Sequence, residues 1–293
     1  MKNSLSPTPQ DTKPTQTGTL FVVGTPIGNL GDLTRRAVET LLSVDCIACE
    51  DTRHTKKLCL HLGVKTPLIS YYREKEQEKS DVLVQMLCDG KNVALVSDAG
   101  TPAISDPGAL LVRKARLAGV DIVAVAGPSA LTAAVSIAGL SQTPFFFAGF
   151  PPANRNEKKR FLYRISTLPY PLVFYESPHR INTTLSIMIE CFGDRWAVLF
   201  RELTKIHEEC IEGRLSTLNN HLQKKVKGEL VLIVSVAERV LTDTPENLDE
   251  LLLWYRDTHQ TSLKDAVQII ASNLELPRSE VYKKALSIWN KTD

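Results

Sequence analysis

The sequence lacks the short strings that identify the commonest nucleotide-binding and hydrolase classes. It contains neither G-x-x-x-x-G-K-[ST] nor G-x-G-x-x-G, so neither a phosphate-binding P-loop nor a dinucleotide-binding turn is predicted. It also lacks G-x-S-x-G, the turn that carries the nucleophile of α/β-hydrolases. The formal net charge is only +2, which is too balanced to demand a nucleic-acid partner, although a local basic patch is compatible with it.

Signals for a metal ion or a membrane are missing too. The six cysteines are scattered, and only Cys46 and Cys49 form a C-x-x-C, inside a predicted strand where their side chains point to opposite faces. We therefore expect buried, reduced thiols, no metal ion and a cytoplasmic protein. The longest apolar stretch, 120–140, contains Asp121 and is interrupted at Gly127, so no membrane span is expected.

The chain beyond its first residues alternates between strand and helix patterns. Residues 1–17 are polar and rich in Ser, Thr and Pro, without the apolar core of a signal peptide, and predict a disordered tail. Apolar runs separated by amphipathic helices then predict a parallel sheet of the α/β class. The expected parts are an N-terminal α/β domain over 18–122, a second, strand-rich α/β domain over 123–240, and a small helical domain over 245–293.

Three loops of the first domain follow predicted strands and are rich in polar residues, glycine or proline. They span 24–30, 50–54 and 97–108. Because the carboxyl ends of parallel strands meet at one edge of a sheet, and ligands bind at that edge, we expect the three loops to form one small-molecule site.

The loop 97–108, SDAGTPAISDPG, indicates the kind of ligand. It contains Asp98 and Asp106 but no lysine or arginine, so it is unsuited to a polyphosphate. Carboxylates with exposed backbone suit an amine, a ribose or a cationic centre, and S-adenosylmethionine offers all three. The alternative is a turn in which the aspartates bond their own backbone.

Charged residues also stand at the ends of other strands. In EDTRHT, Asp51 is a candidate helix N-cap. The charged residues of this string, which include Arg53 and His54, form either a solvated ion-pair cluster or part of a functional site. YESPHR and RELTK place carboxylates directly after apolar strands, where buried acids need partners. The basic groups in these two strings supply such partners or bind phosphate; they are Arg180, Arg201 and Lys205.

Residues 155–164, RNEKKRFLYR, are the most basic segment. Positive charge for the backbone and interleaved rings, Phe161 and Tyr163, fit a single-stranded RNA site. The alternative is an amphipathic helix with a solvated face. The RNA-binding candidates are Arg53, Arg155, Lys158, Lys159, Arg160 and Arg180.

Seven strings, in order, resemble one known family. TPIGNL, EDTRHT, SDAGTPAISDPG, GPSA, FYESPHR, RELTK and KGELVLIV are similar to the motifs of the ribosomal RNA small-subunit methyltransferase I family, over Thr19 to about Val236. The helical tail resembles that family's helix-turn-helix-like domain. One departure is visible: the family usually reads P-T-P-I-G-N-L, and Gly24 replaces the first proline here, which frees the backbone of the first loop.

The resemblance implies a tetrapyrrole-methylase fold (class III), with S-adenosylmethionine in a cleft between two α/β domains and, usually, a homodimer. It implies 2′-O-methylation of a cytidine in 16S ribosomal RNA. The implied partner is this RNA, alone or in the 30S subunit, and neither DNA nor a membrane is implied. The cofactor-lining positions that it implies are Pro26, Asp98, Ala99, Gly100, Thr101, Ile104, Ser129, Ala130, Tyr175, Leu203 and Leu230.

The hydroxyl that accepts the methyl group needs positioning, and a general base would accelerate its reaction. Methyl transfer from a sulfonium needs no Lewis acid, so no metal is expected. The candidate catalytic residues stay open and are Asp51, His54, Glu176, Glu202 and Lys205.

Three other functions remain as alternatives. The nearest is a methylase of the same fold that acts on a tetrapyrrole carbon, which the basic segment and the helical tail disfavour. The second is a non-catalytic RNA-binding protein that kept the fold. A hydrolase that uses Ser97 or Ser105 with His54 is the weakest, since it lacks the nucleophile turn.

Overall fold

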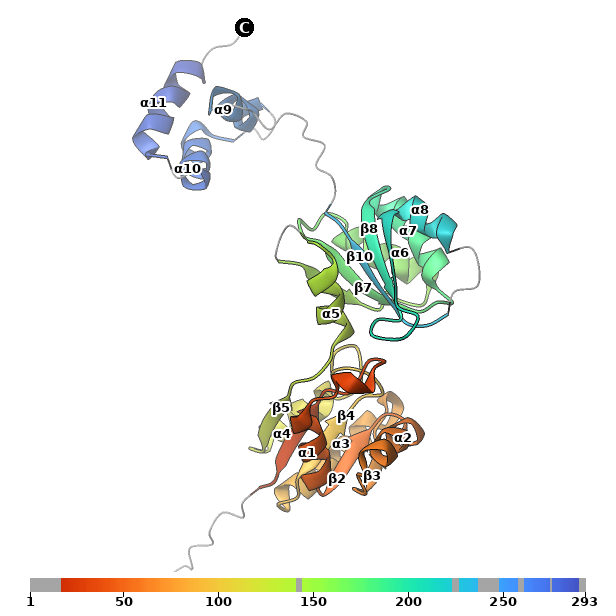
Figure 1. Cartoon of the computed structure of the whole chain (residues 1–293). Helices are drawn as coiled ribbons and strands as arrows, with labels where there is room; N and C mark the ends of the chain where they lie inside the picture. Colours follow the sequence, from red (N-terminus) through yellow and green to blue (C-terminus); the bar gives the residue numbers. More distant parts are fainter. Residues whose placement is uncertain are drawn as a thin grey trace, which may run out of the picture. The chain divides into compact units, whose positions relative to one another are not determined.

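The computed structural model describes residues 17–140, 144–222, 227–236, 248–257, 261–274 and 276–289 (Figure 1). The predicted tail, residues 1–17, lies outside the described residues except for Thr17. The chain divides into two compact units, residues 1–237 and 238–293, and each is described by itself.

The first sheet of the larger unit is parallel throughout, as the sequence predicts. Its strand order is β3-β2-β4-β1-β5. The strands are β1 (Thr19–Val23), β2 (Cys46–Cys49), β3 (Leu68–Ser70), β4 (Val93–Val96) and β5 (Asp121–Val125). The connections from β1 and from β4 lead to opposite sides of the sheet, so β1 and β4 flank its topological switch point, where open α/β sheets bind ligands.

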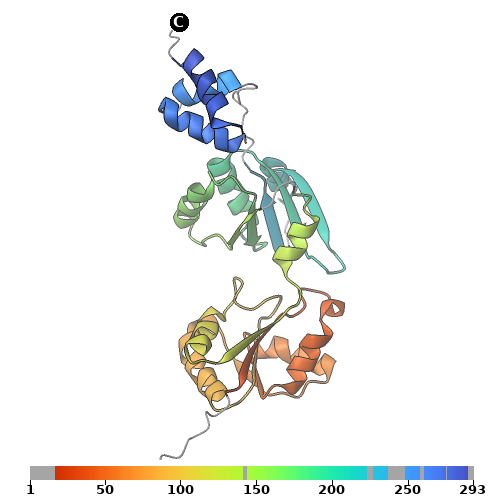
Figure 2. The same ribbon diagram turned by 90° about the vertical axis from the view of Figure 1, so that its left-hand side faces the viewer.

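Two pairs of helices cover the two faces of this sheet (Figure 2). On one face, α1 (Arg35–Ser43) and α2 (Thr52–Leu62) contribute Ala37, Leu41 and Cys59 to the core. On the other face lie α3 (Glu76–Cys88), which follows a short 3-10 turn (Arg73–Lys75), and α4 (Ala109–Leu117). A second 3-10 turn, Leu30–Asp32, precedes α1. Both faces are therefore buried, which is why β2 and β4 consist almost entirely of apolar residues.

The second sheet is mixed, in the order β6-β7-β10-β8-β9. Only β6 (Phe146–Gly149) and β7 (Leu172–Glu176) pair in parallel. The strands β8 (Trp196–Arg201), β9 (Glu209–Arg214) and β10 (Leu230–Val234) pair antiparallel. One face packs on α6 (Arg155–Ile165), α7 (Ile181–Phe192) and α8 (Leu215–His221), and the other packs on α5 (Ala130–Ile137).

The smaller unit consists, in its described part, of three helices, as the sequence predicts. They are α9 (Leu248–Asp257), α10 (Leu263–Asn273) and α11 (Arg278–Ile288). Leu252, Val267, Ile270 and Val281 form its separate core. Across the described residues, no helix is both long and apolar enough to cross a membrane.

The predicted boundary between the two α/β domains is wrong by a few residues. A division at 122/123 would cut β5, which pairs with β1 along its whole length. The division falls instead between Val125, the end of β5, and Ala130, the start of α5, because α5 packs on the second sheet. The apolar residues that begin the predicted second domain at 123 are therefore part of a strand of the first sheet.

The two cysteines of the C-x-x-C lie on opposite faces of β2, as predicted. Cys46 packs into the core under α3 and α4, and Cys49 into the core under α1 and α2. Burial raises the pKa of each thiol to about 11, so both stay protonated and apolar at neutral pH.

Candidate functional site

The loops that follow β1 and β4 meet at the switch point of the first sheet. Thr25 and Gly100 form an isolated antiparallel bridge, in which each N–H donates to the other residue's carbonyl, at 2.9 and 3.1 Å. The buried Thr25 hydroxyl donates to the carbonyl of Ser97 at 3.1 Å. The first and third predicted loops are thus joined backbone to backbone.

The loop 97–108 is shaped by backbone conformations that turns of ordinary sequence avoid. Ala103 and Ser105 have positive φ angles of 66° and 67°, and Gly100 has 80°. The loop is closed at its end by Glu76, whose carboxylate accepts the N–H of Gly108 at 2.9 Å. The loop, with its two glycines, its two prolines and the strained backbone of Ala103 and Ser105, is thus more than a simple turn.

A cavity of about 330 Å³ opens against this loop. That volume lies within the range of small-molecule sites. Loops that follow strands of the first sheet and residues of β7 and β10 in the second sheet contribute to its wall. The wall is lined by Ile27, Asp98, Ala99, Gly100, Thr101, Ile104, Ser105, Asp106, Ser129, Ala130, Phe150, Tyr175, Glu176, Ser177, Pro178, Leu203, Gly228, Glu229, Leu230 and Val231.

The charge of this wall has one sign. Four of its residues are acidic and none of the twenty is lysine, arginine or histidine. Burial, and the nearby carboxylate of Asp98, raise the pKa of Asp106, although a hydrogen bond with Ser97 opposes this. Burial likewise raises the pKa of Glu50, and the nearby carboxylates of Asp106 and Asp98 raise it further. Clustered acids of this kind favour a cationic ligand, which relieves their mutual repulsion.

An aromatic side chain fixes the opposite wall. The Tyr175 hydroxyl accepts the N–H of Leu131, the second residue of α5, at 3.0 Å. The ring of Tyr175 lies 5.0 Å from that of Phe147 and 5.5 Å from that of Phe150. Phe150, which is half-exposed, and Tyr175, which is partly buried, thus offer apolar surface beside the acidic loop, a combination suited to an organic cation.

Ten of the eleven predicted cofactor residues line this cavity. The exception is Pro26, which is not among the lining residues, whereas its neighbour Ile27 is. The lining residues outside the predicted cofactor and catalytic positions are Ile27, Ser105, Asp106, Phe150, Ser177, Pro178, Gly228, Glu229 and Val231. Asp106 belongs to the acidic loop that the sequence indicates as the ligand loop, whereas Phe150 and Glu229 carry no local signal, because only folding brings these segments to the loop.

The structure does not bring Asp51 and His54 into the cavity wall. Asp51 caps α2, since its carboxylate accepts the N–H of Arg53 at 2.8 Å, and it also pairs with the Arg53 side chain. These contacts hold the pKa of Asp51 below its usual range. His54 is exposed. The N-cap interpretation of EDTRHT is therefore confirmed.

Glu202 and Lys205 form an ion pair at 2.7 Å outside the cavity wall. Lys205 also contacts Glu229 at 3.2 Å. The hydrogen bond from Lys205 lowers the pKa of Glu202, and the two carboxylates raise the pKa of Lys205 against the opposing effect of burial. The lowered pKa makes the Glu202 carboxylate a weaker base, and the raised pKa makes the Lys205 ammonium a weaker acid, so neither is well suited to exchange a proton there.

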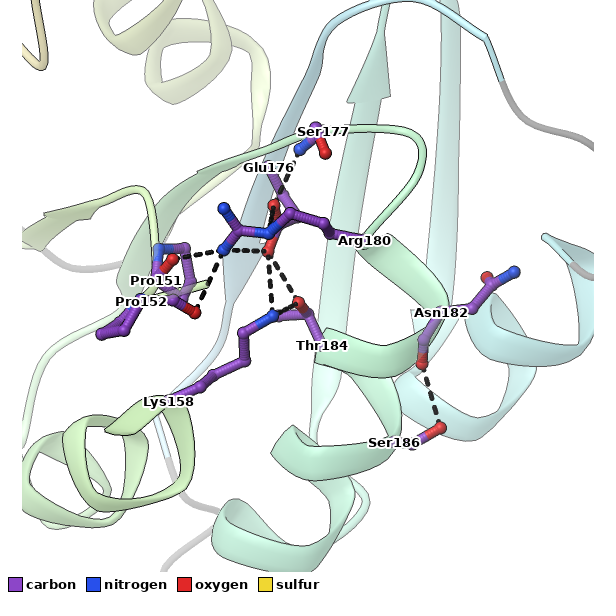
Figure 3. A network of polar contacts seen from close by, with 9 residues as sticks. All are labelled: Pro151, Pro152, Lys158, Glu176, Ser177, Arg180, Asn182, Thr184 and Ser186. Atoms are coloured by element: carbon purple, nitrogen blue, oxygen red, sulfur yellow. Dashed lines mark hydrogen bonds and ion pairs between the residues drawn. The ribbon is translucent and has the colours of Figure 1, made fainter. Parts of the chain in front are cut away.

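Glu176 lines the cavity, but its carboxylate points into the protein (Figure 3). The side chain is completely buried and contacts Lys158, Arg180 and Thr184. The expectation that Lys158 lies on an exposed basic surface is wrong, because only 2% of it is accessible. Because Glu176 and Lys158 are engaged in this buried network, neither side chain is free to contact substrate.

The other predicted RNA-binding residues are accessible to different degrees. On α6, Arg155 and Lys159 are exposed and pair with Glu190 at 3.5 and 3.0 Å. Arg160 is exposed, with no ion pair among the described residues. Arg53 is exposed beside Asp51, and Arg180 is partly buried against Glu176.

Gly24 provides a contact that the family's proline could not make. Its N–H donates to the carbonyl of Val125 at 3.1 Å, one residue beyond the β1–β5 pairing. Its backbone also lies against Gly127, where a Cβ on Gly24 would come within 2.8 Å of Gly127 Cα. The freedom that Gly24 gives the first loop is thus removed by tight packing at the end of β5.

Comparison with known proteins identifies the class that this fold and acidic cavity define. A family model for tetrapyrrole (corrin/porphyrin) methylases matches residues 19–219. Crystal structures share the fold: diphthine synthase with a TM-score of 0.60 and 17% identity, over 75% of this chain and 90% of that one, and uroporphyrin-III-C-methyltransferase from Thermus thermophilus with 0.54 and 19%, over 75% and 96%. The chain is a tetrapyrrole methylase by fold.

Closer relatives narrow this class. The ribosomal RNA small subunit methyltransferase I of Haemophilus influenzae is 46% identical, over 94% of this chain and 99% of the relative. Those of Vibrio cholerae and Bacillus subtilis are 42% and 41% identical, over 95% and 90% of this chain and 98% and 93% of the relatives. The chain belongs to the ribosomal RNA small subunit methyltransferase I family.

Proposed function

We propose that this protein transfers a methyl group from S-adenosylmethionine to the 2′-hydroxyl of a cytidine in the 16S RNA of the small ribosomal subunit. Membership of the family supports an RNA methyltransferase. The observation that carries the cofactor is the cavity wall, whose only charged side chains are carboxylates. We place the protein in the cytoplasm with its ribosomal substrate and infer a homodimer.

The cavity residues fit S-adenosylmethionine. The acidic loop complements its sulfonium and ammonium charges, and the bridge between Thr25 and Gly100 keeps backbone groups of the loop in fixed positions. When bound, the cofactor supplies an electrophilic methyl group. The missing side chain at Gly100 keeps this wall open, since a Cβ there would already lie 3.3 Å from Ile27 Cγ2.

The ribose hydroxyl must lose a proton as it is methylated. Of the carboxylates in the cavity wall, Asp106 has a pKa raised by burial and by its acidic neighbours. A carboxylate with a raised pKa is a stronger base than an ordinary one, so we assign Asp106 as the proton acceptor in place of Glu202 or His54. The protein otherwise contributes by holding the hydroxyl in line with the methyl group.

The RNA contact on α6 is revised by the structure. Lys158 is buried, and Arg155 and Lys159 pair with Glu190. The exposed cations of α6 that we propose for RNA contact are therefore Arg160 and, one turn later, Arg164. Tyr163, between them, is 71% exposed. Two cations that flank an exposed ring fit single-stranded RNA, whose phosphates and bases they would contact together.

Replacing both arginines, Arg160→Gln with Arg164→Gln, should weaken binding to the small-subunit RNA. The slope of log K against log salt should fall by about 0.7 for each lost phosphate contact. Filter binding over a range of salt concentrations measures both. Arg113→Gln with Arg116→Gln on α4 removes the same charge from another exposed helix face. Equal weakening in this control would show a general charge effect and contradict a specific surface on α6.

The activity is tested by incubating the protein with labelled S-adenosylmethionine and small subunits from cells that lack this enzyme. We expect about one labelled methyl group per 16S RNA. The RNA backbone should resist alkaline cleavage after one cytidine, because a 2′-O-methyl group removes the hydroxyl that drives this cleavage. A porphyrinogen offered in parallel should remain unlabelled. Label in the porphyrinogen alone would contradict the proposal, and cofactor binding without any transfer would favour a non-catalytic RNA-binding protein.

A further inference from the structure

A buried ionic network lies behind the wall of the cavity, and the proposed chemistry does not use it (Figure 3). Its centre is the Glu176 carboxylate at the end of β7. Thr184 of α7 donates its hydroxyl to this carboxylate at 2.6 Å and accepts from Lys158 Nζ of α6 at 2.7 Å. Lys158 Nζ itself is 3.7 Å from Glu176, and the Arg180 guanidinium is 3.2 Å away on the other side.

The network joins the two loops that form one wall of the cavity. Arg180 donates to the carbonyls of Pro151 and Pro152, directly after the lining residue Phe150. Glu176 accepts the N–H of Ser177, which lines the same wall, at 2.8 Å. The segments 150–152 and 176–180 are thus tied to each other through one carboxylate.

Two cations share this carboxylate, and Lys158 and Glu176 are buried whereas Arg180 is partly exposed. Lys158 is 2% accessible, and the Glu176 side chain is not accessible at all. Burial lowers the pKa of Lys158 and the Arg180 charge adds to this, while Glu176 opposes it. Buried ionic groups add little net stability compared with apolar residues of the same size. Their presence beside a binding wall therefore calls for an explanation other than stability.

We propose that Lys158 and Thr184 are positioning residues for the cofactor: through Glu176 and Arg180 they hold Phe150 and Ser177 in the geometry that binds S-adenosylmethionine. The proposal rests on the proposed cofactor. Lys158 and Thr184 are not among the residues that line the cavity, so they act only through the wall. Preorganised walls increase affinity because binding then orders fewer side chains.

The test is Lys158→Met, which keeps most of the length of the side chain and removes its charge. Its matched control is Arg195→Met. Arg195 is also a buried cation that joins α6 to α7, but it does so at their other ends, by donating to the carbonyls of Ser166 at 2.6 Å and Phe192 at 3.1 Å. Both variants remove a buried positive charge and should lower the melting temperature, so Arg195→Met controls for a loss of stability that occurs away from the cavity.

Calorimetric titration with S-adenosylmethionine, well below both melting temperatures, should show binding about tenfold weaker for Lys158→Met, which equals about 1.4 kcal/mol. Arg195→Met should bind within about twofold of wild type. Steady-state kinetics should show the Lys158→Met effect in the KM for the cofactor, with kcat within about twofold, because no reacting group is removed. Thr184→Val, a milder change, should weaken binding about threefold and serves if Lys158→Met does not fold.

Unchanged affinity in Lys158→Met, or in Thr184→Val where that variant is used, would overturn the proposal. So would equal weakening in Arg195→Met, which would show that affinity follows stability alone. Wild-type protein that fails to bind S-adenosylmethionine, with or without RNA, would instead contradict the proposed function, so the two failures are distinguishable.

Discussion

Gly100→Arg should abolish binding of S-adenosylmethionine, with a loss of about 100-fold or more, or about 3 kcal/mol. Gly100 has a φ of 80°, a backbone conformation that is strained for residues with a side chain. A Cβ there would lie 3.3 Å from Ile27 Cγ2, and the rest of an arginine would enter the cavity. It would also bring a positive charge into a wall whose charged groups are all acidic. Isothermal titration calorimetry measures the result.

Gly119→Arg is the control for this substitution. Gly119 has a φ of 72°, so arginine pays a similar backbone cost there, but the space around its Cβ is open and it does not line the cavity. This variant should lose some stability and keep its affinity for the cofactor. Normal cofactor binding by Gly100→Arg would contradict the assignment of the cavity.

Gly127→Ala should destabilise the larger unit by about 3 kcal/mol, because overpacking against backbone cannot be relieved by turning a side chain. The new Cβ would lie 2.8 Å from the Gly24 carbonyl oxygen and 2.9 Å from Gly24 Cα. A loss of this size corresponds to a melting temperature lower by about 6–12 °C. Differential scanning calorimetry measures the shift.

Two further variants test the reason for that loss. Gly24→Ala meets the same backbone from the other side, so the double variant should cost less than the sum of the two single ones. Gly31→Ala, whose nearest neighbour is the movable end of the Asn29 side chain, should shift the melting temperature by no more than about 2 °C. If the stability losses of Gly24→Ala and Gly127→Ala were strictly additive, the close approach of the Gly24 and Gly127 backbones would be contradicted.

The parallel sheet and its ligand edge are predictable from sequence because the signals are local. The apolar runs of β1, β2 and β4 define buried strands, and the loops after them must lie at one edge. Thr34, Asp51, Asn154 and Ser262 cap their helices with side-chain oxygens placed next to the first turn. The loop 97–108, read as a ligand loop from its composition, does line the cavity.

The errors occur where a residue's role depends on distant neighbours. RNEKKRFLYR suggests a basic surface, yet Lys158 faces inward because its position on α6 puts it against α7 and the end of β7. The sequence predicts that the second domain begins at residue 123, yet residues 123–125 belong to β5, which completes the first sheet beside β1. Such assignments depend on contacts between residues far apart in sequence, which composition and periodicity do not encode.

By itself, the sequence determined the class of fold, the three loops at one edge and the acidic character of the ligand loop, because each depends on residues close together in the chain. Tertiary structure alone decided which carboxylates face the cavity and which face a lysine. Asp98 and Asp106 line the cavity, whereas Glu176 turns into the protein and Glu202 pairs with Lys205. The physical reason is that a carboxylate's role follows from its partners and its burial, and only the folded chain brings these together.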